Sequence, residues 1–237
     1  MAADGSTRHV FHGRLTASVS RRPSPIRQLF PTLLYSARLQ RRASSSLNDR
    51  LLRECRQLRL DDRAGRQWST QNYPGGYTSY GSASQMHRLS PTFAALQRLV
   101  DGHVQTFART LGFDLGGRNL EMTDCWVNIM RRHGVHSLHL HPLSTLSGTY
   151  YVQVPKGSPG LKFEDPRLER FMAAPPRGAR RRAAPGSLRP ALPTRPWFVL
   201  PAQAGHLVLF ESWLRHEVPP NRAAGERVSI SFNYSWF

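Results

Sequence analysis

From residue 125 onward, the sequence carries six short runs that are rich in β-branched and aromatic residues and are bounded by Gly, Pro or Asn. Runs of this length and composition are typical of β-strands. They follow helical segments without a βαβ alternation, which favours an antiparallel sandwich with helices on one side. The six predicted strands are Cys125–Met130, Leu146–Val154, Leu161–Phe163, Phe198–Leu200, Gly205–Phe210 and Val228–Tyr234.

Two helices are predicted before these strands. In the first, apolar residues recur every three or four positions from Leu47 to Leu58, as one buried helix face requires. The second begins at Ser90-Pro91, a capping hydroxyl followed by proline, and keeps the helical period to Leu111 before Gly112.

Two other segments of the first half have weaker signals. The run Leu29–Leu39 is a candidate first strand, in which Pro31 suits an edge or a strand start. Trp68–Ser84 is predicted to be a Gly- and Tyr-rich loop, whose tyrosines either line a cleft or pack on the core.

The chain is long enough for one substantial domain. With 237 residues, we expect a single domain over residues 28–237, after a disordered basic segment at residues 1–27. Residues 171–196 are rich in Arg and Pro and contain no acidic residue, which predicts a disordered or loosely held insertion.

The net charge of +18 would ordinarily point to nucleic acid. However, all 33 basic residues except Lys156 and Lys162 are Arg, which resembles the codon bias of a GC-rich genome more than a built binding face. Nucleic acid is therefore not the favoured partner, and an RNA-associated protein that binds through Arg177–Arg195 stays an alternative. The two cysteines are too few for a disulfide framework, which favours the cytoplasm. The sequence contains no run of 18 apolar residues, so no membrane span is predicted.

Histidines supply the strongest chemical signal. Four of them occur between His133 and His141, and the last two, His139 and His141, are spaced by two. On an extended backbone this spacing places both rings on one face, where they can bind one ion together. His216, after a later apolar run, is the candidate third ligand. Imidazole ligands favour zinc or a transition metal over calcium and magnesium.

A second signal follows the third histidine. If Pro219, Pro220 and Asn221 reverse the chain, Arg227 and Ser229 lie on the same face of the last strand and point inward. A buried guanidinium requires an anion, and a carboxylate accepts two parallel hydrogen bonds from it. The sequence therefore predicts a carboxylate-bearing cosubstrate beside the metal.

These features together resemble the iron- and 2-oxoglutarate-dependent dioxygenases, and among them a 2OG-Fe(II) oxygenase family of mostly bacterial and phage proteins. The resemblance extends from about Phe30 to the end of the chain. It rests on motifs that occur in the family's order: Trp126-Val-Asn-Ile, His139-x-His141-Pro142, Leu146-Ser-Gly-x-Tyr-Tyr-Val, Phe163-Glu-Asp-Pro-Arg, Gly205-x-Leu-Val-Leu-Phe, Ser212-Trp-Leu-Arg-His216 and Arg227-x-Ser-Ile-Ser-Phe-Asn.

The resemblance implies a mainly β, α+β fold: a double-stranded β-helix, or jelly roll, backed by N-terminal helices. It also implies that Fe(II) is held by His139, His141 and His216, and that Arg227 and Ser229 hold 2-oxoglutarate. The expected reaction consumes O2, converts 2-oxoglutarate to succinate and hydroxylates a small-molecule or peptide substrate. Neither the substrate nor the oligomeric state is predicted.

Three points stay open in the sequence. Most of the wider superfamily has Asp or Glu where His141 stands, so His141 is either a ligand or a neighbour of the metal. Asn128 and Tyr150 either bind the cosubstrate or complete the core. The alternative function is a non-redox jelly roll that binds a metal or a sugar, which would need the histidines but not Arg227.

Overall fold

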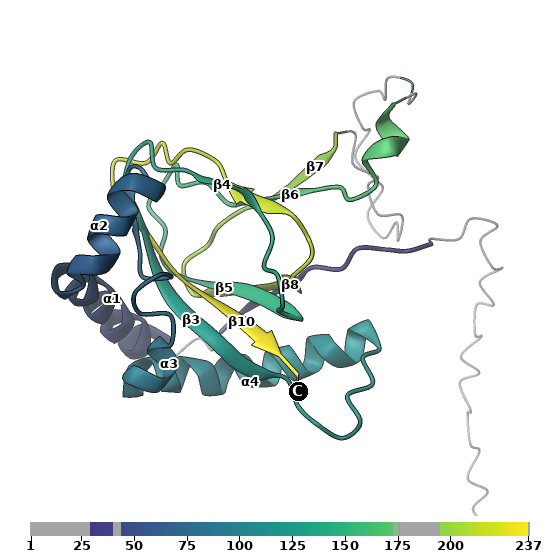
Figure 1. Ribbon diagram of the computed structural model, residues 1–237, viewed down its shortest axis with the longest axis horizontal. Helices are drawn as coiled ribbons and strands as arrows, with labels where there is room; N and C mark the ends of the chain where they lie inside the picture. The colour runs from purple at the N-terminus through teal and green to yellow at the C-terminus, as the bar shows by residue number, and fades with distance from the viewer. Residues whose placement is uncertain (1–28, 40–43, 173–174, 176–194, 237) are drawn as a thin grey trace, which may run out of the picture. The chain divides into compact units, whose positions relative to one another are not determined.

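A computed structural model of the protein describes residues 29–39, 44–172, 175 and 195–236 (Figure 1). The segment 1–27 and nearly all of the predicted insertion at residues 171–196 therefore lie outside the described residues. Leu33–Phe237 forms one compact unit. No helix among the described residues is long and apolar enough to cross a membrane.

The helices precede the main run of strands. They are α1 (Ser44–Asp61), α2 (Arg63–Asn72), α3 (Met86–Leu89) and α4 (Pro91–Leu111), and a 3-10 turn, η1, follows later at Leu168–Phe171. Helix α4 has the predicted ends. The Ser90 hydroxyl accepts hydrogen bonds from the amides of Thr92 and Phe93, and Gly112 ends the helix in the left-handed conformation at φ 75°.

Strands β1 (Tyr35–Arg38), β2 (Gly76–Thr78), β3 (Glu121–Met130), β5 (Leu146–Gln153), β8 (His206–Glu211) and β10 (Arg227–Ser235) form a six-stranded sheet. Their order is β1-β8-β5-β10-β3-β2, and every neighbouring pair is antiparallel. Strand β1 therefore lies at an edge, as its proline-preceded sequence predicts. Strand β10 lies in the middle of the sheet and pairs along most of its length with β3 on one side and β5 on the other.

A smaller antiparallel sheet contains β4 (His136–His139), β6 (Leu161–Glu164), β7 (Trp197–Leu200) and β9 (His216–Val218) in the order β4-β9-β6-β7. In Figure 1 this sheet lies over one face of the six-stranded sheet, and α1, α3 and α4 lie over the other. The fold is therefore mainly β with helices on one side, as predicted.

Residue alternation along β10 separates a core beneath the helices from a polar pocket between the two sheets. On β10, Val228, Ile230, Phe232 and Tyr234 point into the core beneath the helices. The residues between them, Arg227, Ser229 and Ser231, line a pocket between the two sheets. Because successive side chains on a strand point to opposite faces, one strand carries both the helix-facing core and the polar site.

The prediction for Trp68–Ser84 was wrong in part. Residues 68–72 belong to α2, which begins after the Asp62 cap, and residues 76–78 form β2. Tyr77 packs in the core, whereas Tyr80 is 52% exposed, so the two interpretations of the tyrosines divide between residues. The short elements α3, β4 and β9 were not among the predicted ones.

Candidate metal centre

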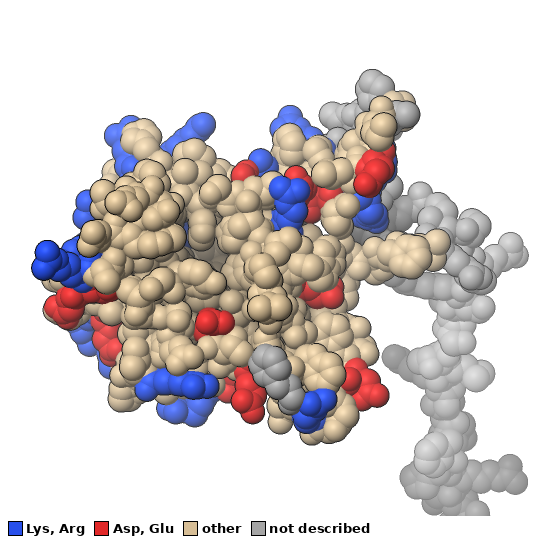
Figure 2. Space-filling model, in the orientation of Figure 1, with Lys and Arg blue, Asp and Glu red and all other residues tan. Residues whose placement is uncertain are grey.

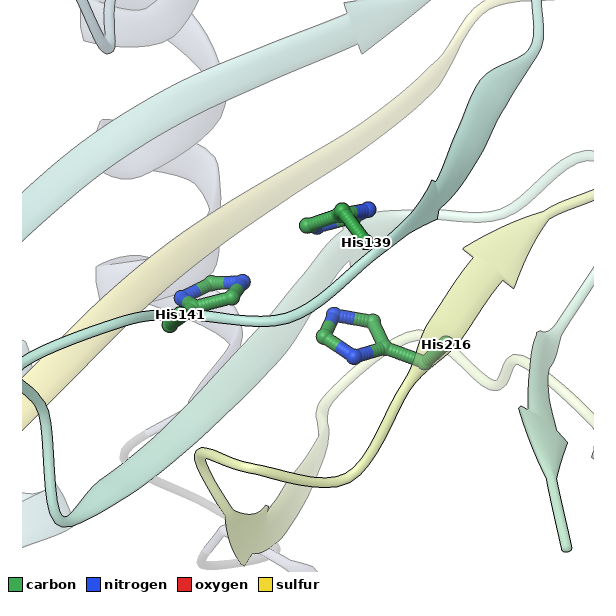
Figure 3. A group of neighbouring side chains, drawn as sticks. All are labelled: His139, His141 and His216. Carbon is green, nitrogen blue, oxygen red and sulfur yellow. The ribbon is translucent and has the colours of Figure 1, made fainter. Parts of the chain in front are cut away.

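Two paired strands and the segment after one of them bring the three candidate ligands together (Figure 3). His139 ends β4 and lies opposite His216, the first residue of β9. His141 is held two residues later, where its backbone amide donates to the carbonyl of Ser212 at 3.0 Å. The possible ligand atoms of His139, His141 and His216 all lie within 4.8 Å of one another.

Hydrogen bonds fix which ring nitrogen each histidine offers. Nδ1 of His139 lies 2.7 Å from the Ser137 carbonyl oxygen, and Nδ1 of His216 lies 2.9 Å from that of Leu214. Nδ1 of His141 lies 2.6 Å from Oδ1 of Asn233. Each partner is an oxygen acceptor, so each Nδ1 carries the proton and donates. Nε2 of every ring is left with a free lone pair, the arrangement that a metal ligand requires.

The same rings are neutral at pH 7. Burial lowers the pKa of His216 to about 2 and that of His141 to about 4, and it also lowers the pKa of His139. Because a metal ion must displace any proton on its ligand, neutral rings bind it without that competition. Three imidazoles suit iron, zinc, copper or nickel, so the residues fit an iron ion.

No carboxylate completes the group among the described residues. The two acids of the motif Phe163-Glu-Asp-Pro-Arg have cationic partners instead. Glu164 is paired with Arg215 at 2.9 Å, and Asp165 is paired with Arg167 at 3.1 Å. The site that the structure assembles is therefore a three-histidine site.

Arg227 opens β10 and lines the pocket that the three histidines share. It is 2% exposed. Its Nε donates to the Pro159 carbonyl at 3.1 Å, and its Nη1 donates to Oγ of Ser229 at 3.1 Å. No carboxylate of the described residues forms an ion pair with it. A buried, unpaired guanidinium is costly, so the pocket is built for an anion from outside the chain.

Two more buried polar atoms near Arg227 lack an ordinary hydrogen bond. They are Oδ1 of Asn128, whose Nδ2 donates to Ser231 at 3.0 Å, and the hydroxyl of Tyr151, which has no hydrogen bond of ordinary geometry but interacts with the Arg227 guanidinium. That guanidinium lies over the Tyr151 ring, 5.0 Å from its centroid. Buried polar atoms are normally satisfied, so Oδ1 of Asn128 marks unfilled binding capacity. Asn128 thus lines the pocket as predicted, although its role stays a prediction.

Tyr150 does not reach this pocket. It is 1% exposed and packs in the core beneath the helices, where its hydroxyl donates to Oδ1 of Asn48 at 3.0 Å. The prediction that Tyr150 binds the cosubstrate is therefore wrong. Register explains it: Tyr151 pairs with Ser229 on β10, so Tyr151 shares the pocket face and Tyr150 points the other way.

Two further residues escaped the sequence analysis as parts of the site. His136 stacks on His139, with ring centroids 4.4 Å apart, and lines the pocket. Asn233 holds His141 through the hydrogen bond described above. The sequence did contain a signal for Asn233, because it stands four residues after Ser229 and so shares its face of the strand in a regular register.

Residues 124–233 match the model of a protein family described as "Putative 2OG-Fe(II) oxygenase". The matched residues include the three histidines, Arg227 and Ser229. The match confirms the resemblance to the 2OG-Fe(II) oxygenases, and it supports an oxidoreductase whose cofactors are Fe(II) and 2-oxoglutarate. A search of curated protein sequences found no match.

Solved structures of oxygenases share the fold. The chain is similar to the non-heme alpha ketoglutarate dependent epimerase SnoN from nogalamycin biosynthesis (TM-score 0.61, 14% identity, 86% of this chain and 78% of that one). It is also similar to a Pseudomonas putida prolyl-4-hydroxylase (0.52, 15%, 87% and 94%) and to HygX from Streptomyces hygroscopicus with nickel, 2-oxoglutarate and hygromycin B bound (0.53, 16%, 86% and 83%). These similarities confirm the predicted double-stranded β-helix.

Proposed function

We propose that this oxygenase hydroxylates a C–H bond of a peptide or small-molecule substrate in the cytoplasm, while 2-oxoglutarate is decarboxylated to succinate. His139, His141 and His216 would hold Fe(II), and Arg227 with Ser229 would hold the cosubstrate. The bound metal and cosubstrate supply the activation of O2. The observation that carries the proposal is the buried Arg227, which has no carboxylate partner among the described residues and lines the same pocket as the three histidines.

The chain's own residues orient and select in this scheme. The guanidinium of Arg227 is fixed by Pro159 and Ser229, so it meets a carboxylate in one preset orientation. Pocket walls of Leu161, Phe210 and Val218 keep water from the ion pair and so strengthen it. Asn128 offers a polar contact to the pocket that is still unfilled, through its Oδ1.

The pocket is narrow before any ligand binds. Its cavity volume is about 30 Å³. The histidines are tied by hydrogen bonds to backbone or to Asn233, so we expect any widening on entry of the cosubstrate to come from the apolar wall residues.

The deciding experiment is an anaerobic titration of the metal-free protein with Fe(II) and then 2-oxoglutarate, followed through the visible charge-transfer absorption of the chelated keto acid. We expect a band in the wild type and none in His139→Ala. In Arg227→Ala we expect iron to bind normally but 2-oxoglutarate to bind about 100-fold more weakly or worse, because a desolvated charge-assisted pair is lost.

Arg56→Ala is the matched control, since Arg56 is exposed on α1 and contacts Gln153 instead of the pocket. A wild-type protein that binds iron but gives no band would instead support a non-redox metal-binding jelly roll. Equal 2-oxoglutarate affinity in Arg227→Ala and wild type would overturn the assignment of this arginine.

A further inference from the structure

A second, wider cavity adjoins the metal centre on its outer side. It has a volume of about 150 Å³ and lies between α2, the segment after β2 and the segment after β4. It shares His139 and His141 with the inner pocket. A molecule in this outer groove therefore lies directly beside two of the candidate metal ligands.

Aromatic rings form much of the outer groove. Trp68 comes from α2, Tyr80 from the segment after β2, and Trp126 from β3. The rings of Tyr80 and Trp126 pack edge to face with centroids 4.9 Å apart. Trp68 is 43% exposed and Tyr80 is 52% exposed, so both rings still have open surface to cover. Leu140 and Pro142 add apolar surface from the strand side.

The described residues that line the outer groove include no Asp, Glu, Lys or Arg. Three of its polar side chains already have partners: Nδ2 of Asn72 donates to the Trp68 carbonyl, Oγ1 of Thr78 accepts from the Tyr80 amide, and Asn233 is bonded to His141. Figure 2 shows that, in this view of the whole molecule, most charged side chains lie toward the margins of the surface. A charged group in the groove would lose its water without gaining a partner.

We infer that the outer groove binds the group to be oxidised, and that this group is an uncharged, apolar ring or aliphatic chain. Trp68 and Tyr80 are the specificity-determining residues, since they present the open aromatic surface. The inference rests on the proposed function, because it takes the metal centre as the place of reaction.

The test is binding of a charge-matched series to the full chain, with and without Fe(II) and 2-oxoglutarate under anaerobic conditions. The probes are the N-acetyl amides of leucine, phenylalanine, lysine and glutamate, and affinity is measured by saturation-transfer NMR titration. We expect the leucine and phenylalanine probes to bind at least about tenfold more tightly than the lysine and glutamate probes. The peptide Gly-Gly-Leu-Gly-Gly is compared with N-acetyl-leucine amide in the same titration. Tighter binding of the peptide indicates that the group belongs to a polypeptide, and weaker binding indicates that it belongs to a small molecule.

Two substitutions in the groove sharpen the test. Trp68→Ala should weaken binding of the apolar probes about tenfold, because it removes an exposed ring that they would cover. Trp68→Glu should reverse the order and make the lysine probe bind more tightly than in the wild type, because it supplies the missing charge. Trp197→Ala, which removes a tryptophan of similar exposure (40%) on β7 outside the groove, should change nothing. Circular dichroism verifies the fold of each variant.

The outcomes separate the two proposals. If the charge-transfer band forms but the four probes bind equally, or Trp68→Ala binds them as the wild type does, the inference about the groove is wrong and the oxygenase stands. If the band never forms but the apolar probes bind through Trp68, the groove is a binding site and the proposed oxygenase reaction is wrong.

Discussion

At the scale of single residues, Asn233 connects the metal centre to the rest of the fold. Its Oδ1 accepts from Nδ1 of His141 at 2.6 Å and from Oγ of Ser147 at 2.8 Å, while its Nδ2 lies 3.4 Å from Oδ2 of Asp124. Within the part of the chain that the structure describes, no carboxylate joins the three histidines, and Asp124 is connected to His141 only through the Asn233 amide. Asn233 sets the tautomer and the orientation of the one histidine that departs from the wider superfamily.

Replacing this amide should weaken metal binding. We expect Asn233→Ala to lower Fe(II) affinity by about 10- to 100-fold, because His141 loses the acceptor that holds its Nδ1 proton and orients the ring. Anaerobic calorimetric titration measures the change. Ser147→Ala is the control, since it removes the other donor to the same oxygen without touching a histidine. Equal losses in the two variants would mean that the effect is structural and would contradict the positioning role.

Adjacent tyrosines provide a matched pair of tests. Tyr151→Phe should weaken 2-oxoglutarate binding about tenfold, because the hydroxyl interacts with the Arg227 guanidinium. It should change the free energy of unfolding by less than about 1 kcal/mol, because that hydroxyl makes no hydrogen bond of ordinary geometry in the free protein. Tyr150→Phe should lower the free energy of unfolding by about 1 kcal/mol through the lost bond to Asn48, without affecting 2-oxoglutarate. Charge-transfer titration and urea unfolding measure the two effects. If Tyr150→Phe weakened 2-oxoglutarate binding and Tyr151→Phe did not, Tyr150 and not Tyr151 would face the pocket.

Residue identities predicted the centre better than its surroundings. His139, His141, His216 and Arg227 were visible because their spacing and chemistry are unusual in themselves. Tyr151 was not, because the face that a strand residue occupies depends on which strand lies beside it, and neither neighbour of β5 is close in sequence.

At the scale of elements, local signals succeeded where an element stabilises itself. Helix α4 has a capping serine, a proline at its start, a helical apolar period and a terminal glycine, and all four were visible in the sequence. Helix α2 has a weaker local signal, with Gly65 near its start, and depends on Asp62, which also accepts from Tyr77 at 2.8 Å. Strands β2, β4 and β9 have three or four residues each and exist through pairing with distant strands.

The cap of α4 offers a test of stability that leaves the chemistry untouched. Ser90→Ala should lower the free energy of unfolding by about 1–2 kcal/mol, since it removes the acceptor for two helix amides and the bond to Glu54. Urea unfolding measures the loss. Fe(II) affinity should remain that of the wild type because α4 packs on the face of the sheet away from the histidines. A matching loss of metal affinity would show that the helix layer and the metal centre are coupled.

At the scale of the whole molecule, the buried His216 and the half-buried histidines around it make the stability of the metal-free protein dependent on pH. Burial lowers the pKa of His136 to about 3, alongside the low values of His141 and His216. Below pH 6.5 the unfolded chain takes up protons on these rings, whereas the folded chain does not. Stability is therefore lost as the pH falls through 6.5, well above the range in which the carboxyls of Asp62, Asp165 and Glu226 titrate, because their pKa values are lowered in the fold.

We expect the free energy of unfolding of the chelator-treated protein to be at least about 2 kcal/mol lower at pH 5 than at pH 7. Urea unfolding at the two pH values measures this difference. The double variant His139→Gln/His216→Gln should show a clearly smaller difference, because it removes two of the rings that the fold keeps neutral. An unchanged difference in the double variant would place the pH dependence outside the metal centre.

The alternation along β10 has a consequence for how this protein can change over time. Even-numbered positions from Val228 to Tyr234 hold the sheet to its helices, whereas odd-numbered positions from Arg227 to Asn233 face the pocket and the metal centre. Substitutions at odd positions can therefore remodel the reaction while the scaffold is inherited intact. An insertion or deletion of a single residue in the middle of β10 would exchange the two sets on one side of the change, and so would disturb fold and chemistry together.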